Sequence, residues 1–319
     1  MRVVMPGGTG QIGMFIAGWL RSQGHTVQVI GRSVEDPALR WDGRTLGPWA
    51  DAIDGADAVV NLAGRTVNCR YHWRNLNQMM NSRVESAMVL GEAIARAKHP
   101  PRVWLQASTA TIYAHTFGEP HTEADGVLGS HTPGRPPYWT YSVNIARSWE
   151  LAMRQADTPH TRRVAMRFGF AMSPDPGGIF DWLMWLVNRG LGGLFYGGQQ
   201  YVSWIVDIDL ARAIGLLLEA DHVDGVVNLT APEPVPNRDF MRALRHAAGV
   251  PVGIPVVPGM AELGALMLGT DVELMRKSRR VVPARLTQEG FAFEHPSWPD
   301  AAVDLVKRWR AGDRLSTAA

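Results

Sequence analysis

Residues 5–13 read MPGGTGQIG, a glycine-rich segment near the beginning of the sequence. A short apolar run over residues 2–5 precedes it, and apolar residues recur at three- and four-residue spacing after it. These patterns predict a β-strand, a tight turn and an α-helix, in that order. In that context, the spacing Gly7-x-x-Gly10-x-x-Gly13 is typical of a turn that binds the diphosphate of a dinucleotide at the positive end of a helix.

The three glycines have different predicted tasks. Gly7 permits the tight turn, Gly10 lets the backbone approach the diphosphate, and Gly13 lets the helix pack closely on the sheet. An ordinary glycine-containing turn between a strand and a helix is the alternative interpretation. The residues of this turn that we predict to bind the cofactor are Gly7, Thr9, Gly10, Gln11, Ile12 and Gly13.

The end of the second predicted strand, residues 27–30, indicates which dinucleotide is bound. NAD-binding folds usually carry an acidic residue there, which accepts hydrogen bonds from the 2′-hydroxyl of the ribose. This chain has Arg32 instead, and a guanidinium group suits the 2′-phosphate of NADP(H) because it donates paired, charge-assisted hydrogen bonds. We therefore predict NADP(H) as the cofactor. The alternative is a solvated Arg32, with Glu35 or Asp36 contacting the ribose.

Strand and helix patterns alternate through the first half of the chain. Mostly apolar strands separated by helical patterns predict an α/β fold, in which a parallel sheet is covered on both faces. We expect a doubly wound Rossmann sheet over residues 1–230, with a pocket insertion at about 171–202, and a smaller C-terminal α/β substrate or cap region over 231–319. The further predicted strands cover residues 58–62, 103–107 and 163–168, and the predicted helices cover residues 82–98 and 141–153.

The composition argues against several classes of function. The 319 residues are 46% hydrophobic and 19% charged, which is ordinary for a globular protein with a sizeable core. A formal net charge of +2 gives no support for nucleic-acid binding. The single cysteine, Cys69, fits a reducing compartment, and we find neither a secretory signal nor an apolar stretch of membrane-spanning length. We expect a cytoplasmic protein whose partners are a small-molecule substrate and, in a homodimer, a second copy of itself.

Several motifs along the chain resemble those of one protein family. Besides the glycine turn, NLAG at 61–64 and SR at 82–83 resemble an extended short-chain dehydrogenase/reductase. The later motifs are similar to those of the atypical, epimerase-like branch of that family, which carries a distinctive C-terminal domain. These later motifs are SWE at 148–150, SWIVDIDL at 203–210, NLTAPEPVPNRDF at 228–240 and VVPARLTQEGFAFEHP at 281–296.

This resemblance implies positions for the rest of the site. It places Thr109 at the position of the active-site serine or threonine, at the end of the strand beside the nicotinamide. It also places Trp204 in a wall of the substrate pocket, where the family usually has a histidine at the position of Val206. The further cofactor contacts that the resemblance implies are Leu62, Ala63, Gly64, Ala107 and Ser108.

The helix predicted over residues 141–153 lacks part of the usual catalytic pair. The superfamily carries Tyr-x-x-x-Lys, a spacing that puts both side chains on one face of a helix. The lysine lowers the pKa of the tyrosine from about 10 toward the working pH. Here Tyr141 is followed at that spacing by Ile145. The lysines of the chain lie elsewhere in the sequence, at Lys98, Lys277 and Lys307.

Two tyrosines therefore compete for the role of proton donor. Tyr141 occupies the expected helix position, and Tyr113 resembles the pocket-lining tyrosine that follows the preceding strand in extended members. Without a base, reduction of a carbonyl is easier to sustain than oxidation of an alcohol, because neutral tyrosine or threonine can still donate a hydrogen bond. We therefore favour NADPH-dependent reduction of a carbonyl, enone or imine of a small molecule. The alternatives are an NADP(H)-binding, redox-responsive module without turnover, and an epimerase or dehydratase that uses transient oxidation.

Two tryptophans are candidates for the substrate pocket, and three histidines are candidates for a metal site. Trp182 and Trp185 lie three residues apart in an apolar segment, which indicates core packing, a lid over the pocket or an aromatic platform for the substrate. His115, His121 and His131 cluster in one loop region. Their spacing matches no zinc or iron signature and no cysteine lies nearby, so we predict no metal site.

Overall fold

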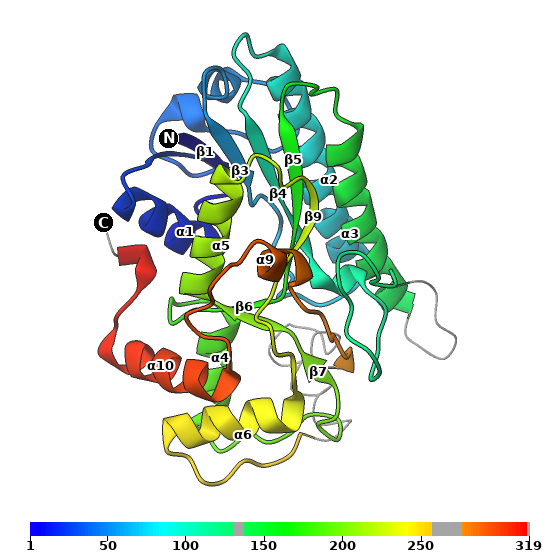
Figure 1. The fold of residues 1–319 in the computed structure, drawn as a ribbon, viewed down its shortest axis with the longest axis vertical. Helices are drawn as coiled ribbons and strands as arrows, with labels where there is room; N and C mark the ends of the chain where they lie inside the picture. Colours follow the sequence, from blue (N-terminus) through cyan, green and yellow to red (C-terminus); the bar gives the residue numbers. More distant parts are fainter. Residues whose placement is uncertain (130–136, 257–275, 318–319) are drawn as a thin grey trace.

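The computed structural model of the protein describes residues 1–129, 137–256 and 276–317. Its centre is a six-stranded parallel sheet (Figure 1). In their order across the sheet, the strands are β2 (Thr26–Ile30), β1 (Arg2–Pro6), β3 (Ala58–Asn61), β4 (Val103–Thr109), β5 (Arg162–Phe168) and β9 (Gly225–Leu229). This is the doubly wound Rossmann order without its outermost strand, in whose place Gly31 and Arg40 form a single bridge. The predicted α/β fold class and Rossmann sheet are confirmed.

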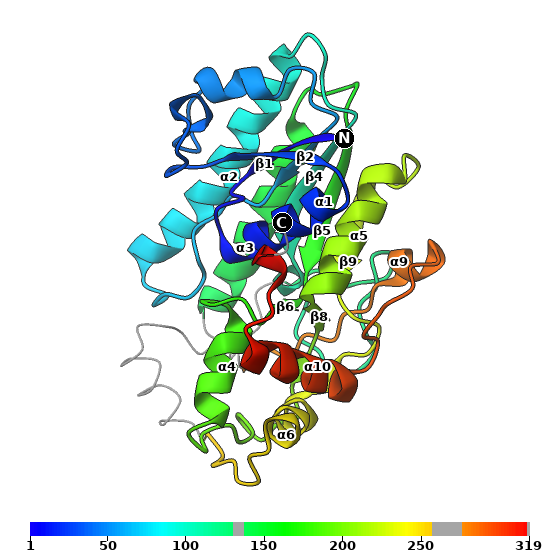
Figure 2. The same ribbon diagram turned by 90° about the vertical axis from the view of Figure 1, so that its left-hand side faces the viewer.

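Helices cover both faces of the sheet. They are α1 (Gln11–Ser22) and α5 (Asp207–Glu219) on one face, and α2 (Trp73–Arg96) and α3 (Pro137–Gln155) on the other (Figures 1 and 2). Successive side chains of a strand point to opposite faces, so Val3 and Met5 pack with α1 and α5, whereas Val4 packs with α2 and α3. Burial on both faces explains why the strands are apolar along their whole length.

Helix α2 begins earlier than predicted, at Trp73 rather than at Ser82. His72 caps its amino end by accepting a hydrogen bond from the backbone N–H of Asn75 at 3.4 Å. The first two turns carry several polar side chains, which weakens their helical pattern in the sequence. Leu76 nevertheless holds these early turns in place, because it is buried in a small apolar cluster shared with α3.

A second, smaller core lies in the lower part of Figure 1. It combines apolar residues of 172–206 with apolar residues of 231–309, so the predicted pocket insertion packs with the C-terminal region. Its elements are β6 (Phe170–Met172), α4 (Ile179–Val187), β7 (Tyr201–Val202), β8 (Trp204–Val206), β10 (Val235–Pro236), α6 (Asn237–Ala248) and α10 (Trp298–Ala311). The remaining helices among the described residues are α9 (Ala284–Gln288), which packs on β9, and the 3-10 helices η1 (Pro37–Leu39), η2 (Pro48–Ala52), η3 (Ala110–Ile112) and η4 (Leu315–Thr317).

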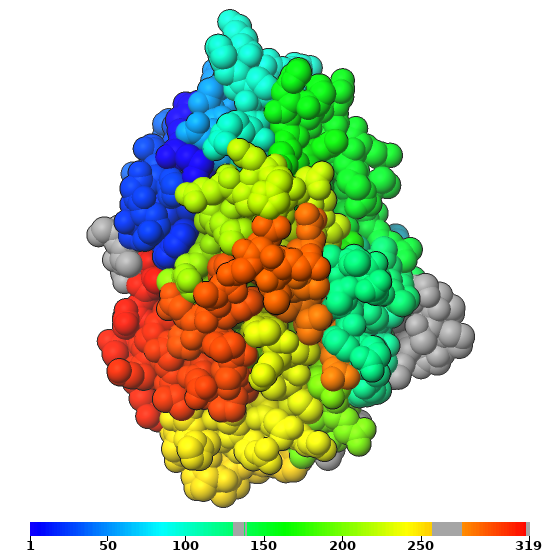
Figure 3. All heavy atoms as spheres, viewed as in Figure 1, coloured from blue at the N-terminus to red at the C-terminus, as the bar shows by residue number. Residues whose placement is uncertain are grey.

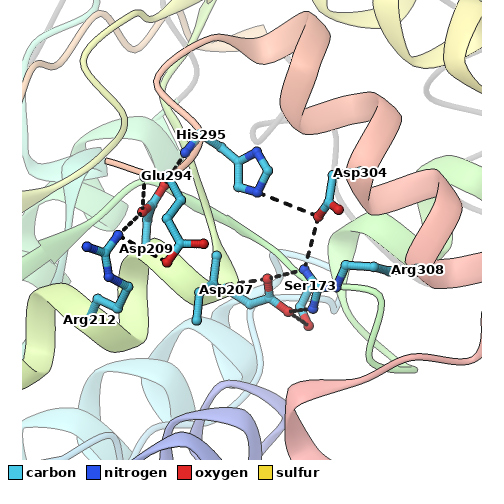
Figure 4. A network of polar contacts seen from close by, with 9 residues as sticks. Ser173, Asp207, Asp209, Arg212, Glu294, His295, Asp304 and Arg308 are labelled. Atoms are coloured by element: carbon cyan, nitrogen blue, oxygen red, sulfur yellow. Dashed lines mark hydrogen bonds and ion pairs between the residues drawn. The ribbon is translucent and has the colours of Figure 1, made fainter. Parts of the chain in front are cut away.

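Ion pairs fasten this second core to the Rossmann sheet (Figure 4). Arg308 of α10 donates hydrogen bonds of 2.9 and 2.8 Å to the two carboxylate oxygens of Asp207, the first residue of α5. Asp207 is fully buried and also accepts a hydrogen bond from Ser173 at 3.1 Å. Two residues further along α5, Asp209 accepts the backbone N–H of His295 at 3.0 Å. Helix α10 and the loop before it are therefore held to the start of α5.

The end of the described chain returns to its beginning. Helix η4 packs against α1, where a Cβ atom added at Gly18 would lie 2.5 Å from the carbonyl oxygen of Leu315. Figure 3 shows the red atoms of this C-terminal segment adjoining the blue atoms of the N-terminal region. Only a glycine allows the two backbones to approach this closely.

Candidate cofactor and active site

Four neighbouring strands bring the predicted cofactor residues to one edge of the sheet. Because β2, β1, β3 and β4 are parallel, their carboxyl ends lie at the same edge. Arg32 follows β2, the glycine turn 7–13 follows β1, and residues 62–64 follow β3. Residues 107–109 end β4 beside them. The order of connection reverses between β1 and β3, which is where ligands bind in doubly wound sheets.

The glycine turn is tightly packed on its inner side and open at Gly10. Gly7 has a φ of +79°, and a Cβ atom there would lie 2.6 Å from the backbone nitrogen of Ala63. A Cβ atom at Gly13 would lie 2.5 Å from the Cα of Gly8. At Gly10, by contrast, the added atom would meet only the carbonyl oxygen of Gly7, at 3.4 Å. The spare room lies where a diphosphate is expected.

The amino end of α1 fits an anionic group. Gly10 is the N-cap residue and contributes no side-chain hydrogen bond, and the first turn of α1 contains no acidic residue. Both Thr9 and Gly10 are exposed. The positive end of this helix is therefore available to a phosphate group. The side chain of Gln11 points elsewhere, because its Nε2 donates to the carbonyl oxygen of Asp175 at 3.4 Å.

The NLAG motif shapes the loop after β3. Asn61 is fully buried, and its Nδ2 donates to Gln106 at 2.9 Å while its Oδ1 accepts the backbone N–H of Ala63 at 3.0 Å. These bonds fix the course of Leu62 and Ala63 next to the glycine turn. Gly64, the next residue, is exposed at the edge of the site.

Arg32 is exposed at the end of β2, whereas one of its acidic neighbours is committed elsewhere. The side chain of Asp36 accepts the backbone N–H of Ala38 at 2.9 Å and thereby caps η1. Glu35 is exposed as well, and its backbone carbonyl accepts a hydrogen bond from Arg40. Arg32 is thus exposed next to Gly31, where an added Cβ atom would lie 3.2 Å from the side chain of Thr9 in the glycine turn.

The structure places Tyr113 in the core, although its sequence position suggested a pocket wall. Its side chain is only 1% exposed, and its hydroxyl donates to Asn228 at 2.9 Å and accepts from Arg167 at 2.8 Å. Burial raises the pKa of Tyr113, although Arg167 and Asn228 act in the opposite direction. In this structure the hydroxyl proton of Tyr113 is donated to Asn228 rather than offered to a ligand, and its role in chemistry stays a prediction.

A buried ion pair stands behind the end of β4. Glu150, on α3, accepts hydrogen bonds from Arg167 at 2.8 and 2.9 Å and from Ser108 Oγ at 2.6 Å. Burial alone would raise the pKa of Glu150, but the hydrogen bonds and charge of Arg167 outweigh it and hold the pKa below its ordinary value. Because the hydroxyl of Ser108 donates its proton to this carboxylate, Ser108 can contact a cofactor only through its backbone or as a hydrogen-bond acceptor.

Thr109 keeps a donor for a ligand. Its Oγ accepts the backbone N–H of Thr111 at 3.1 Å and so caps η3. That interaction uses a lone pair and leaves the hydroxyl proton of Thr109 to be donated. The side chain is half-buried at the carboxyl end of β4. Among the hydroxyl groups considered at this edge, Thr109 is therefore the best placed to hydrogen-bond a reacting carbonyl.

Tyr141 lies on α3 without the charge that would activate it. Its hydroxyl donates to Asn77 Oδ1 at 2.7 Å, and burial raises its pKa, which is opposite to what a base requires. Ile145, at the lysine position, is buried in an apolar cluster with Leu76 and Met79. The departure from Tyr-x-x-x-Lys is thus built into the packing between α2 and α3.

Lys277 is a candidate residue of the active site that the sequence analysis did not single out. Its side chain is only 3% exposed, and its Nζ donates to the carbonyl oxygen of Thr111 at 2.6 Å, two residues beyond Thr109. The sequence placed it only in the C-terminal region, and its return to the end of β4 depends on tertiary structure. The scarcity of lysines was the one signal that could have drawn attention to it.

A small apolar cavity of about 50 Å³ adjoins Lys277. Trp182 lines it, together with Phe170 and Phe240, and the role of this tryptophan in a substrate pocket stays a prediction. Trp185, by contrast, is 40% exposed and lies under the guanidinium of Arg189. Trp204, expected in a pocket wall, is fully buried and packs edge-on against Trp298.

No group of three metal-ligating side chains occurs in the part of the chain that the structure describes. Likewise, no helix of residues 1–129, 137–256 or 276–317 is long and apolar enough to cross a membrane. His121 is buried and contacts the carbonyl oxygen of Ala114 through Nε2. His131 lies outside the described residues.

The sheet and the open glycine turn define a dinucleotide-binding Rossmann protein. Comparison with known proteins identifies the family: the chain belongs to the NAD dependent epimerase/dehydratase family, whose model matches residues 3–230. Residues 260–305 match a domain of unknown function, DUF1731. The resemblance inferred from the sequence motifs is therefore confirmed.

Relatives and solved structures agree with this assignment. The mouse epimerase family protein SDR39U1 is 30% identical over 310 residues, which cover 96% of this chain and 100% of the relative. A crystal structure of human SDR39U1 with NADPH superimposes with a TM-score of 0.82 at 26% identity, over 96% of this chain and 99% of that one. A nucleoside-diphosphate sugar epimerase from Corynebacterium glutamicum gives a TM-score of 0.75 at 25% identity, over 99% of this chain and 59% of that one.

Proposed function

We propose that the protein is an NADP(H)-dependent oxidoreductase of the atypical extended short-chain dehydrogenase type, which reduces a carbonyl, enone or imine of a small molecule. The observation that carries this proposal is the composition of one sheet edge. A glycine turn open at Gly10, an exposed Arg32 and the hydroxyl of Thr109 all lie at the carboxyl ends of adjacent strands. Together they supply an anion site, a choice of dinucleotide and a hydrogen-bond donor.

NADP(H) is supported by two independent observations. The first is Arg32, whose guanidinium follows β2 at the position where a 2′-phosphate lies in dinucleotide-binding folds. Asp36, one of the acidic residues that could have contacted a ribose hydroxyl instead, is engaged in capping η1. The second is the crystal structure of human SDR39U1, which contains NADPH.

The direction of the reaction follows from which proton-transfer groups the site offers. NADPH, when bound, supplies a hydride to the substrate. Thr109 can polarise a carbonyl by donating a hydrogen bond, and it needs no altered pKa to do so. Oxidation of an alcohol requires a base, and the pKa of Tyr141 is raised rather than lowered. The site therefore favours reduction.

One observation favours a second candidate, an NADP(H)-binding module without turnover that responds to the redox state of the cofactor. The hydroxyl groups of Ser108, Tyr113 and Tyr141 all donate to protein acceptors in this structure.

An epimerase or dehydratase would need reversible oxidation and hence a base that the pair Tyr141 and Ile145 does not provide. Net loss of NADPH identifies a reductase, product formation without net loss identifies an isomerase, and binding alone identifies the module.

The test is NADPH oxidation, followed by nicotinamide absorbance, across a panel of ketones, aldehydes, conjugated enones and imines. We expect turnover with at least one class, and a fall in kcat of about 100-fold for Thr109→Val because a transition-state donor is lost. Thr109→Ser is the matched control, since it keeps both the hydroxyl and the cap on Thr111, and it should retain most activity. Binding of NADPH with no oxidation by any compound would support the module instead.

A further inference from the structure

Arg83 lies beside the expected cofactor site, on the helix that follows β3. A Cβ atom added at Gly64 would lie 3.2 Å from the Cζ of Arg83, so the guanidinium rests directly against that exposed glycine. Its other side faces Trp149, whose ring centre is 5.0 Å from the guanidinium carbon. Nη1 donates to the carbonyl oxygen of Met79 at 3.1 Å. The geometry holds the group in one place and leaves Nε and Nη2 as further donors.

Arg83 is half-buried, and it differs from two other arginines of restricted exposure, Arg167 and Arg308, in having no counter-ion among the described residues. Arg167 is paired with Glu150, and Arg308 is paired with Asp207. Within the described residues, by contrast, no carboxylate forms an ion pair with Arg83, and its hydrogen bond goes to a neutral carbonyl. Burial lowers the pKa of Arg83 to about 10. A desolvated charge without a partner is costly, so an anionic ligand that pairs with Arg83 would be bound favourably there.

The nearest expected anion is the diphosphate of the cofactor. The backbone of Leu62 and Ala63 touches the turn at Gly7, and Gly64 is the next residue along. Arg83 therefore flanks the glycine turn from the β3 side, whereas Arg32 flanks it from the β2 side. A 2′-phosphate belongs to the β2 side. A diphosphate bound at the amino end of α1 would lie between the two arginines.

We propose that Arg83 is a cofactor-binding residue that pairs with the diphosphate of the dinucleotide through charge-assisted hydrogen bonds. This inference rests on the proposed function, because it requires a bound dinucleotide. It divides the recognition of NADP(H) between two arginines. Arg32 selects the 2′-phosphate, and Arg83 neutralises the part that NADPH and NADH share.

The experiment compares ligand affinities by isothermal titration calorimetry, in the wild type, Arg83→Met and Arg32→Ala. The ligands are NADPH, NADH and adenosine 2′-monophosphate, which carries a 2′-phosphate but no diphosphate. We expect Arg83→Met to weaken NADPH and NADH equally, by about 10- to 100-fold, and to leave the monophosphate unaffected. Arg32→Ala should do the reverse, weakening NADPH and the monophosphate while sparing NADH.

Thermal unfolding of the cofactor-free protein separates this role from a structural one. Arg83→Met keeps the packing on Trp149 and removes an uncompensated charge, so its Tm should equal or exceed that of the wild type, while the rise in Tm on adding NADPH should shrink. Arg83→Lys keeps the charge without the paired donors and should lose less affinity than Arg83→Met. Arg96→Met, on the exposed end of the same helix, is the control and should bind all three ligands normally.

Each failure has its own meaning. A lowered Tm with unchanged dinucleotide affinity would overturn the inference and make Arg83 a structural residue. Unchanged dinucleotide affinity with a raised KM for an anionic substrate would overturn it in favour of a substrate contact. If the wild type itself binds neither NADPH nor NADH, the proposed function fails, whatever Arg83 does.

Discussion

The turn after β1 and the ends of β4 and β5 lie along the same sheet, yet they are built differently. The first is made of backbone, with glycines packed so closely that only Gly10 leaves room outside. The second is made of side chains, in which Ser108, Glu150, Arg167 and Tyr113 form one buried network. The first region keeps its donors for a ligand, and the second commits them to the protein.

This difference explains why cofactor binding is easier to infer than chemistry. An open turn at the start of a helix indicates an anion site, because its backbone N–H groups and the positive end of the helix both favour negative charge. A side-chain network that satisfies itself stabilises the fold and contributes no donor to a substrate. Thr109 is the exception, because its own hydroxyl proton is not used in capping η3.

The largest effect expected from breaking the network is that of Glu150→Gln. It leaves Arg167 buried without its counter-ion, and we expect the free energy of unfolding to fall by about 3–5 kcal/mol in denaturant titrations. Glu92→Gln removes an exposed ion pair to Arg96 and is the control, with an expected change below about 1 kcal/mol. Equal effects of the two changes would mean that the network is not a stabilising unit.

The ion pair between Glu150 and Arg167 makes the stability of the fold depend on pH in the acid range. The pKa of Glu150 in the folded protein lies below its ordinary value of 4.5, so its contribution to stability is complete above about pH 4.5 and is lost as the pH falls through the folded-state pKa. We expect the slope of unfolding free energy against pH in that range to be shallower for Glu150→Gln than for the wild type. An unchanged slope would show that other carboxylates determine the loss of stability at low pH.

Substitution at the open position of the glycine turn should have the opposite effect to substitution in the Glu150 network: it should weaken NADPH binding more than it lowers stability. Gly10→Ala is compatible with the extended φ of −76° and should change the free energy of unfolding by no more than about 1 kcal/mol, while NADPH affinity falls at least tenfold. Gly13→Ala drives a methyl group into Gly8 and should cost about 2–3 kcal/mol. Calorimetric titration and denaturant unfolding measure both. Equal stability losses would contradict the distinction between an open and a packed glycine.

The smallest effect is expected at Tyr141. Tyr141→Phe removes one hydrogen bond to Asn77 and should lower the free energy of unfolding by about 0.5–1.5 kcal/mol. If Thr109 is the main donor, kcat should fall by less than it does in Thr109→Val. A larger fall in kcat at Tyr141, without loss of stability, would move the principal proton donor to α3.

Local patterns in the sequence were sufficient for the sheet and the turn. The spacing of Gly7, Gly10 and Gly13 and the mismatch at Ile145 are relations between residues a few positions apart, and helix and strand geometry make them readable. The commitment of Tyr113 to Arg167 joins positions 54 residues apart, and no periodicity reports it. The hydrogen bond of Lys277 to Thr111 spans 166 positions. Such pairings depend on how the elements pack, and so the sequence alone left two tyrosines competing and Lys277 unassigned.

The contact between Gly18 and Leu315 also has a consequence for folding in time. During synthesis α1 is among the first elements to leave the ribosome, but the residues that cover its Gly18 face follow almost 300 positions later. Closing so distant a contact is entropically expensive and slow. A fragment that stops after β9 would therefore keep the cofactor turn while leaving the back of its helix bare, and aggregation of such a fragment would say nothing about whether the turn binds a dinucleotide.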